Sequence, residues 1–229
     1  MNTLLSVDWD YFSGALEHVF DSPLWGSPDL AFDRCERWRE RARRRGGSSF
    51  EILRQDFPLL AEPQKLLRFA GVPTFAVSSH DAAYGLLERL NCSNVINLDS
   101  HHDLFSSSGD PSRVRPGNWA GLALEHGLIE SYSCLYPSWH ANVRVTEGFD
   151  LDRTWSEIGA RVWRDRVFLA RDDSVLATIE PNFVLLVLSP SWSNPLYDST
   201  FIEIARGLNA EIEPGLLCRS WRPAALAHS

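Results

Sequence analysis

Short apolar runs recur along the chain, and several of them stop abruptly at ionisable side chains. The clearest run covers residues 95–98, is polar only at Asn97, and is followed by the acidic and histidine-rich stretch 99–103. Two more runs, 3–7 and 74–77, are also followed by acidic or histidine residues. Runs of this length are typical of strands in a parallel sheet that is covered on both faces, with polar side chains following their carboxyl ends.

Apolar runs of this kind alternate with stretches of helical periodicity. The pattern predicts strands at 1–7, 74–77, 95–98, 131–136, 167–170 and 183–188, and helices at 29–45, 63–70, 82–90, 118–126, 149–163 and 197–208. This order predicts an α/β fold of three α/β/α layers with a mainly parallel sheet. No internal repeat or linker interrupts the order, so we expect a single domain over residues 1–229.

Two segments are rich in Gly, Pro and Ser and are predicted to be loops. Residues 13–28 follow the first strand, and residues 106–117 follow the 99–103 stretch, so both are placed to border a site. The last few residues of the chain carry weak signals, and we expect them to be disordered.

The 99–103 stretch has the residue types and the spacing of a metal site. Asp99, His101 and Asp103 stand at positions i, i+2 and i+4, so their side chains point the same way if the strand stays extended. Carboxylates and imidazoles suit a divalent ion such as Mn²⁺, Fe²⁺, Co²⁺ or Zn²⁺. A solvated acidic turn would have the same spacing, and the other two runs argue against that alternative.

Those two runs supply further candidate ligands. Asp8 and Asp10 flank Trp9, share a face on an extended strand, and would repel each other at close range unless a cation lay between them. His80 stands where a strand passes into a helix, which is where open α/β sheets place their ligands. A solvated edge strand and a helix-capping histidine are the structural alternatives.

Composition narrows the classes of partner. The net charge of −8 and the pI near 5.3 argue against nucleic acid and against an anionic membrane surface. The four cysteines form no C-x-x-C pair, and no leader or membrane-spanning run is apparent, so we expect a reduced, cytoplasmic protein that acts on a small molecule.

Several other residues are candidates for a substrate pocket. Asn118, Trp119, Trp139 and Trp192 are placed to form its wall, although core packing is the commoner fate of a tryptophan. Arg113, in the 106–117 loop, would hold an anionic group of a substrate or simply keep the loop soluble.

Three motifs together resemble the metal-binding motifs of the arginase (ureohydrolase) superfamily: His80, Asp99-x-His101-x-Asp103 and Ser6-x-Asp8-x-Asp10. A finer resemblance, through residues 99–104, 118–119 and 136–139, is to an uncharacterised family related to arginases. In arginases the S-x-D-x-D motif follows the D-x-H-x-D motif, whereas here it opens the chain. A circularly permuted arrangement would reconcile the two orders.

The resemblance implies a centre of two divalent ions, with Mn²⁺ favoured and Zn²⁺, Fe²⁺ or Co²⁺ as alternatives. One ion would be held by His80, Asp99, Asp103 and Asp8, and the other by Asp99, His101, Asp8 and Asp10, with Asp8 and Asp99 as bridges. A bridging hydroxide would attack the carbon of a guanidine, amidine or amide, so the implied activity is hydrolysis of a non-peptide C–N bond. Asp103 would carry the proton, with His102 or His140 as helpers.

Two alternatives stay open at this point. A single-zinc site of the deacetylase type would use Asp99, His101 and Asp8. A non-catalytic metal-binding or scaffold protein would keep the ligands for folding alone. The oligomeric state and the substrate are not predicted.

Overall fold

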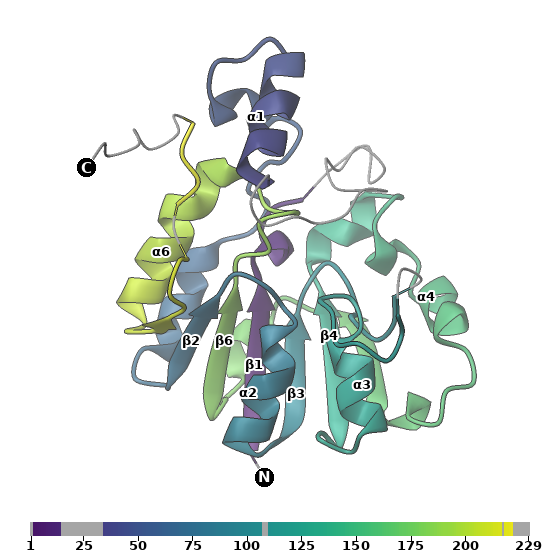
Figure 1. The fold of residues 1–229 in the computed structure, drawn as a ribbon. Coiled ribbons are helices and arrows are strands. Elements are labelled where there is room, and N and C mark those ends of the chain that lie inside the picture. Colours follow the sequence, from purple (N-terminus) through teal and green to yellow (C-terminus); the bar gives the residue numbers. More distant parts are fainter. Residues whose placement is uncertain (1, 15–33, 107–109, 217, 222–229) are drawn as a thin grey trace.

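The computed structural model describes residues 2–14, 34–106, 110–216 and 218–221. In these residues seven strands form one sheet in the order β5-β4-β3-β1-β6-β2-β7, and every neighbouring pair is parallel (Figure 1). The strands are β1 (Asn2–Asp8), β2 (Thr74–Val77), β3 (Cys92–Leu98), β4 (Ser131–Tyr136), β5 (Val167–Arg171), β6 (Phe183–Val187) and β7 (Glu211–Ile212).

The first strand lies in the middle of the sheet. β1 pairs with β3 on one side, where Val7 aligns with Leu98, and with β6 on the other, where Asp8 aligns with Val187. β2 pairs with the far side of β6. Because all these strands run the same way, their carboxyl ends meet at one edge, and the residues that follow β1, β2, β3 and β6 come together there.

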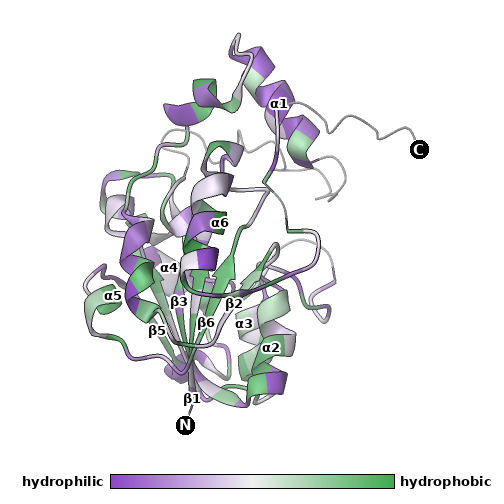
Figure 2. Cartoon of the chain, turned by 90° about the vertical axis from the view of Figure 1, so that its left-hand side faces the viewer, coloured by the Kyte–Doolittle hydropathy of each residue, from purple (hydrophilic) through white to green (hydrophobic). Residues whose placement is uncertain are grey.

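Helices cover both faces of the sheet, which explains why the strands bury apolar side chains on both sides. One face packs against α2 (Ala82–Leu90), α3 (Trp119–Glu125) and α4 (Leu151–Ile158). The other packs against the 3-10 helix Pro63–Phe69, α5 (Val175–Thr178) and α6 (Asp198–Gly207). Leu4 and Leu5 of β1 are both fully buried, although they point to opposite faces. Figure 2 shows the strands as an apolar layer between these helices.

A smaller unit lies beyond the carboxyl edge of the sheet. α1 (Arg34–Arg44) and the 3-10 helix Phe50–Arg54 share a separate core of Trp38, Ala42, Phe50, Leu53 and Phe57. Figure 1 shows α1 above the ends of β1 and β6, away from the two helix layers. This unit is inserted between β1 and β2 in the sequence and does not contribute to the sheet.

The α/β fold with a parallel sheet is confirmed, and all six predicted strands are present. The predicted helix 149–163 ends early, because Gly159 adopts a positive φ of 66°. Pro63–Phe69 is a 3-10 helix, and β7 and α5 were not predicted. The predicted loop 13–28, apart from its first two residues, the start of the 29–45 helix and the end of the chain lie outside the described residues. None of the described helices has the length and apolar character needed to cross a membrane.

Candidate metal centre

The two acidic motifs reach the centre through turns. β1 ends at Asp8 and passes into a 3-10 turn, in which the Asp8 carboxylate accepts the backbone N–H of Asp10 at 3.1 Å. β3 ends at Leu98, and the Asp99 carboxylate accepts the N–H of His101 at 2.8 Å. Neither strand stays extended through its motif, so the extended geometry on which the shared direction was argued is not the one that forms. An aspartate that caps the residue two positions on is an Asx turn, and it brings the alternate side chains to the same place.

The third residue of the 99–103 motif is fixed by helix α3. Asp103 has a positive φ of 52°, which a short polar side chain tolerates better than a bulky one. Its backbone carbonyl accepts the N–H of Ala120 at 3.1 Å, and its carboxylate accepts the indole N–H of Trp119 at 2.8 Å. The start of α3 therefore positions both the backbone and the side chain of Asp103.

Three carboxylates surround one nitrogen of His80. Its Nδ1 lies 3.1 Å from Asp8 Oδ2 and 3.2 Å from Asp99 Oδ2. It also lies 2.9 Å from Asp103 Oδ2. The side chains of His80, Asp8 and Asp99 offer ligand atoms that all lie within 4.8 Å of one another, and all three are buried. They form a first potential metal-binding group.

A second group lies beside the first and shares Asp99. His101 Nδ1 is 3.1 Å from Asp10 Oδ2 and 3.6 Å from Asp99 Oδ1. The ligand atoms of Asp10, Asp99 and His101 also lie within 4.8 Å of one another. Asp99 therefore turns one oxygen to each histidine, which is the arrangement that a carboxylate bridging two cations requires.

The charges of the cluster fit bound cations. Burial, together with the charges of Asp8 and Asp99, raises the pKa of Asp10 well above its usual range. Burial and the charge of Asp99 raise the pKa of Asp103 to about 7. Burial alone would lower the pKa of His80, but Asp103 and the other carboxylates outweigh it and raise that pKa. Without a metal ion, the cluster therefore needs protons to balance its charge.

Burial and the neighbouring carboxylates also have opposite effects on the pKa of the second histidine, His101. Burial would lower the pKa of His101, but Asp10 and Asp99 outweigh it and raise that pKa. Burial would raise the pKa of Asp99, yet the hydrogen bonds from His101 and His80 hold it well below its usual value. Four carboxylates and two imidazoles in one buried cluster are a donor set suited to two divalent ions.

A layer of polar side chains orients the ligands from behind. Ser6 Oγ lies 2.7 Å from His80 Nε2, so the other nitrogen, Nδ1, faces the carboxylates. Asn97 donates to Asp99 Oδ2 at 2.9 Å, the N–H of Ser100 donates to Asp10 at 3.2 Å, and the Ser189 hydroxyl donates to Asp8. Such partners fix ring and carboxylate orientation at metal sites. Ser6 was visible as part of its motif, but the roles of the other three residues were not predicted.

The two candidate helper histidines lie behind the ligands. His102 Nδ1 accepts the N–H of Leu104 at 3.0 Å, and burial lowers its pKa. His140 is fully buried, its Nε2 lies 3.2 Å from Ser100 Oγ, and burial lowers its pKa to about 3. Both imidazoles are therefore neutral at pH 7, and His140 reaches the centre through Ser100.

Two of the candidate pocket residues are buried beside the ligands. Trp119 is fully buried, and its ring lies 5.0 Å from that of His80. Asn118 accepts the N–H of Arg115 at 2.7 Å and donates to the carbonyl of Arg113 at 3.0 Å, so its amide closes its own loop. Arg113 is exposed on that loop. Contact of these three residues with a substrate stays a prediction, and the geometry of Trp119 favours a role in positioning Asp103.

The open side of the centre lies at His101. Its side chain is 35% exposed, whereas that of His80 is 2% exposed. The half-buried Trp192 packs against His101, with ring centroids 4.9 Å apart. Trp139 is also half-buried, and its indole N–H donates to the carbonyl of Tyr11 at 3.0 Å. Trp192 is therefore the candidate pocket residue in direct contact with a ligand at the exposed side.

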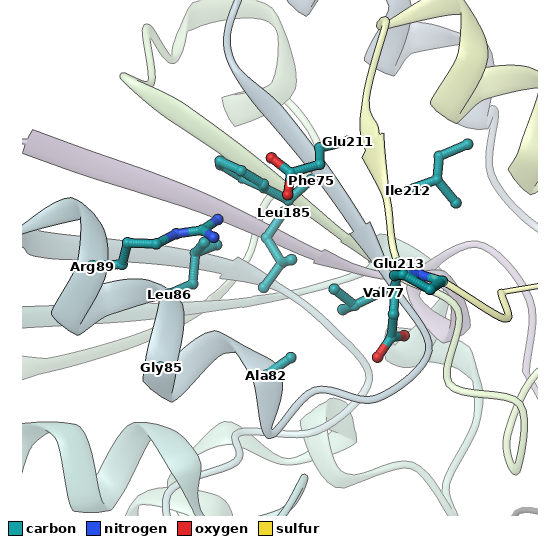
Figure 3. Close-up of a pocket in the computed structure, with 11 residues that line it drawn as sticks. Phe75, Val77, Ala82, Gly85, Leu86, Arg89, Leu185, Glu211, Ile212 and Glu213 are labelled. Atoms are coloured by element: carbon teal, nitrogen blue, oxygen red, sulfur yellow. The ribbon is translucent and has the colours of Figure 1, made fainter.

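A separate cavity of about 330 Å³ lies on the α2 side of the sheet. Its lining includes Phe75, Leu86, Arg89, Ile212 and Glu213 (Figure 3). None of the candidate metal ligands lines it, so its position does not bear on the metal centre.

Comparisons with known proteins identified no relative of this chain. No family model, no curated protein and no solved structure matches this chain.

Proposed function

We propose that this protein is a metal-dependent hydrolase of a non-peptide C–N bond, with a centre of two divalent ions related to that of the arginases. The observation that carries the proposal is the position of Asp99 between two ligand groups, with Oδ2 beside His80 and Oδ1 beside His101. Two adjacent cations that share a carboxylate are characteristic of two-metal hydrolytic sites.

The ligands divide between the two groups. His80, Asp8 and Asp99 would hold the buried ion, with Asp103 beside them, and His101, Asp10 and Asp99 would hold the more exposed one. Two divalent ions, when bound, supply Lewis acidity and lower the pKa of water, so that a nucleophile is available near neutral pH. Oxygen-rich ligands favour Mn²⁺, with Zn²⁺, Fe²⁺ and Co²⁺ as alternatives.

The residues of the chain supply orientation and a proton carrier. Ser6 and Asn97 orient His80 and Asp99, and Trp119 orients Asp103. Asp103 is the proposed proton carrier, because its carboxylate borders His80 and lies beside the buried ligand group. A small substrate would approach past His101 and Trp192, the exposed side of the centre.

The two alternatives have less support. A single-zinc site of Asp99, His101 and Asp8 is disfavoured because Asp8 and His101 fall in different ligand groups. A non-catalytic metal-binding protein would have the same ligands, and only an activity measurement separates it from a hydrolase.

Metal content per chain is the first test. After reconstitution with Mn²⁺, we expect about two ions per chain, and about one in the Asp10→Ala variant, because Asp10 belongs only to the second group. Elemental analysis of the desalted protein measures both. A single tightly held zinc, unaffected by the substitution, would instead support the deacetylase-type alternative.

Activity is tested on the same preparation. We expect the Mn²⁺-loaded protein to hydrolyse at least one member of a panel of guanidines, amidines and acylated amines, and the Asp10→Ala variant to be far slower. The released ammonia, amine or urea is measured for each substrate. Two bound ions without turnover of any panel member would favour the non-catalytic alternative.

A further inference from the structure

One loop contacts both ligand groups from outside the three motifs. The loop 188–194 follows β6, and the Ser189 hydroxyl in it donates to the Asp8 carboxylate. Three residues on, the Trp192 ring packs on His101 at 4.9 Å. Asp8 belongs to the buried ligand group and His101 to the exposed one, so this loop sets the position of a ligand in each.

The loop needs external support to keep this shape. Ser189 adopts a positive φ of 45°, which is unfavourable for a residue with a β-carbon. Within the loop, the Ser193 hydroxyl donates to the carbonyl of Leu188 at 2.7 Å. On the side away from the ligands, the carbonyl of Pro190 accepts the indole N–H of Trp38 at 2.7 Å.

Arg219 supplies the rest of that support. Its guanidinium donates to the Pro190 carbonyl at 2.5 Å and to Ser193 Oγ at 3.1 Å. The same guanidinium pairs with both oxygens of Asp198 at 2.8 and 2.6 Å, and the Arg219 and Asp198 side chains are only 8% and 2% exposed. A planar fork held by a buried carboxylate has one available orientation, so its remaining N–H groups are fixed in space.

We propose that Arg219 is a positioning residue of the metal centre, which fixes loop 188–194 so that Ser189 holds the Asp8 carboxylate and Trp192 covers His101. The inference rests on the metal centre of the proposed function. Part of the metal affinity would then depend on the ion pair between Asp198 of α6 and Arg219. Neither residue contacts a candidate ligand.

A double-mutant cycle on Mn²⁺ affinity tests the inference. The variants are Arg219→Gln, Ser189→Gly and the pair, and glycine is chosen because it tolerates the positive φ of position 189. Free Mn²⁺ is measured by electron paramagnetic resonance during titration of the full chain. We expect each single variant to weaken binding about tenfold, and the pair clearly less than the product of the two losses, because Arg219 acts in part through the hydrogen bond that Ser189 donates to Asp8.

Two control variants separate positioning from a loss of folding. Arg219→Lys keeps the buried charge but not the fork, and it should fold while still losing several-fold in Mn²⁺ affinity. Arg166→Gln removes a comparable arginine, which donates to the carbonyls of Ile129 and Leu124 away from the centre, and should bind Mn²⁺ like the wild type. Thermal unfolding without metal reports the stability of every variant.

The outcomes distinguish this inference from the proposed function. Unchanged Mn²⁺ affinity in Arg219→Gln and Arg219→Lys, or an additive loss of about a hundredfold in the pair, would overturn the positioning role. The two-metal hydrolase would survive that result. Conversely, a coupled loss of affinity in a protein that hydrolyses no panel member would support the positioning role and count against the enzyme.

Discussion

Asp99 is the residue on which both halves of the centre depend. Its two oxygens face different histidines, and Asn97 and the N–H of His101 orient them. Asp10 faces only His101 among the two histidines, and its loss leaves the first group intact. Substitution of Asp99 should therefore remove both ions, whereas substitution of Asp10 should remove only one.

The Asp99→Asn variant should lose both ions. An amide has one oxygen and no charge, so it cannot bridge two cations, and we expect the affinity for each ion to fall on the order of a hundredfold or more. Metal content after dialysis measures this. His102→Ala is the matched control within the same motif, because the His102 ring accepts a backbone N–H and should leave the metal content unchanged. Loss of both ions in the control would mean that the wrong histidine was assigned.

Sequence spacing identified the candidate ligand residues but not how they converge. The i, i+2 spacing of Asp8 and Asp10 predicted a shared direction on an extended strand, and the structure achieves it with an Asx turn. Both geometries need the same spacing, so the sequence could not separate them. The hydrogen bond from Ser189 to Asp8 could not be predicted for another reason, since it depends on β6 lying beside β1 in the sheet.

At the scale of elements, helix α3 packs closely against the stretch that carries the candidate ligands, and a glycine makes this possible. The N–H groups of Ala120 and Gly121 point at the carbonyl of Asp103 at 3.1 and 3.4 Å. A β-carbon at Gly121 would lie 1.8 Å from the carbonyl oxygen of Leu104, which is far inside van der Waals contact. The absence of a side chain there lets the helix approach the backbone of the ligand segment.

Gly121→Ala should therefore separate α3 from this stretch. We expect a loss of roughly 1–3 kcal/mol in the free energy of unfolding, together with weaker Mn²⁺ binding, because Leu104 adjoins Asp103. Denaturant unfolding and Mn²⁺ titration measure the two effects.

Gly85→Ala is the matched control in α2. Nothing lies within 4 Å of its added β-carbon, so this substitution should raise stability by about 0.5–1 kcal/mol through helix propensity alone. An equal response of the two glycines would contradict the close docking of α3.

Strands were predicted correctly where the apolar pattern extends over at least four residues. All six strands of four residues or more that were predicted are present, since each buries side chains on both faces. β7 has only two residues and is defined by its pairing with β2, so no local pattern marks it. The strand order was also not predicted, because it depends on which helices cross which face.

At the scale of the whole molecule, the cluster makes stability depend on pH and metal together. In the metal-free protein the pKa values of His80 and His101 are raised above 6.5 by the surrounding carboxylates, which outweigh burial. Their protonated forms stabilise the fold fully below pH 6.5, and this contribution is lost as the pH rises through the folded-state values. Bound metal takes the place of these protons, so metal binding should release protons.

The gap in melting temperature between metal-loaded and metal-free protein should therefore widen from pH 6 to pH 8.5. At a metal concentration a thousand times Kd the stabilisation is about 4 kcal/mol, which corresponds to a shift of roughly 10 °C for a chain of this size. Calorimetry with Mn²⁺ or with a chelator measures the gap. Asp99→Asn, which lacks the bridge, should show a much smaller gap at both pH values, because a hundredfold weaker affinity leaves only about 1.4 kcal/mol of stabilisation at the same metal concentration.

The central place of β1 sets an order of events during synthesis. β1 carries Asp8 and Asp10 and leaves the ribosome first, but its neighbour β6 begins only at Phe183, and Ser189 lies 181 positions after Asp8. Contacts between such distant parts of a chain form slowly, and the middle strand of the sheet stays without one partner until then. In the proposed metal centre, Asp8 therefore gains its hydrogen bond from Ser189 only after residue 189 has been synthesised, so the final geometry of the centre forms late in folding.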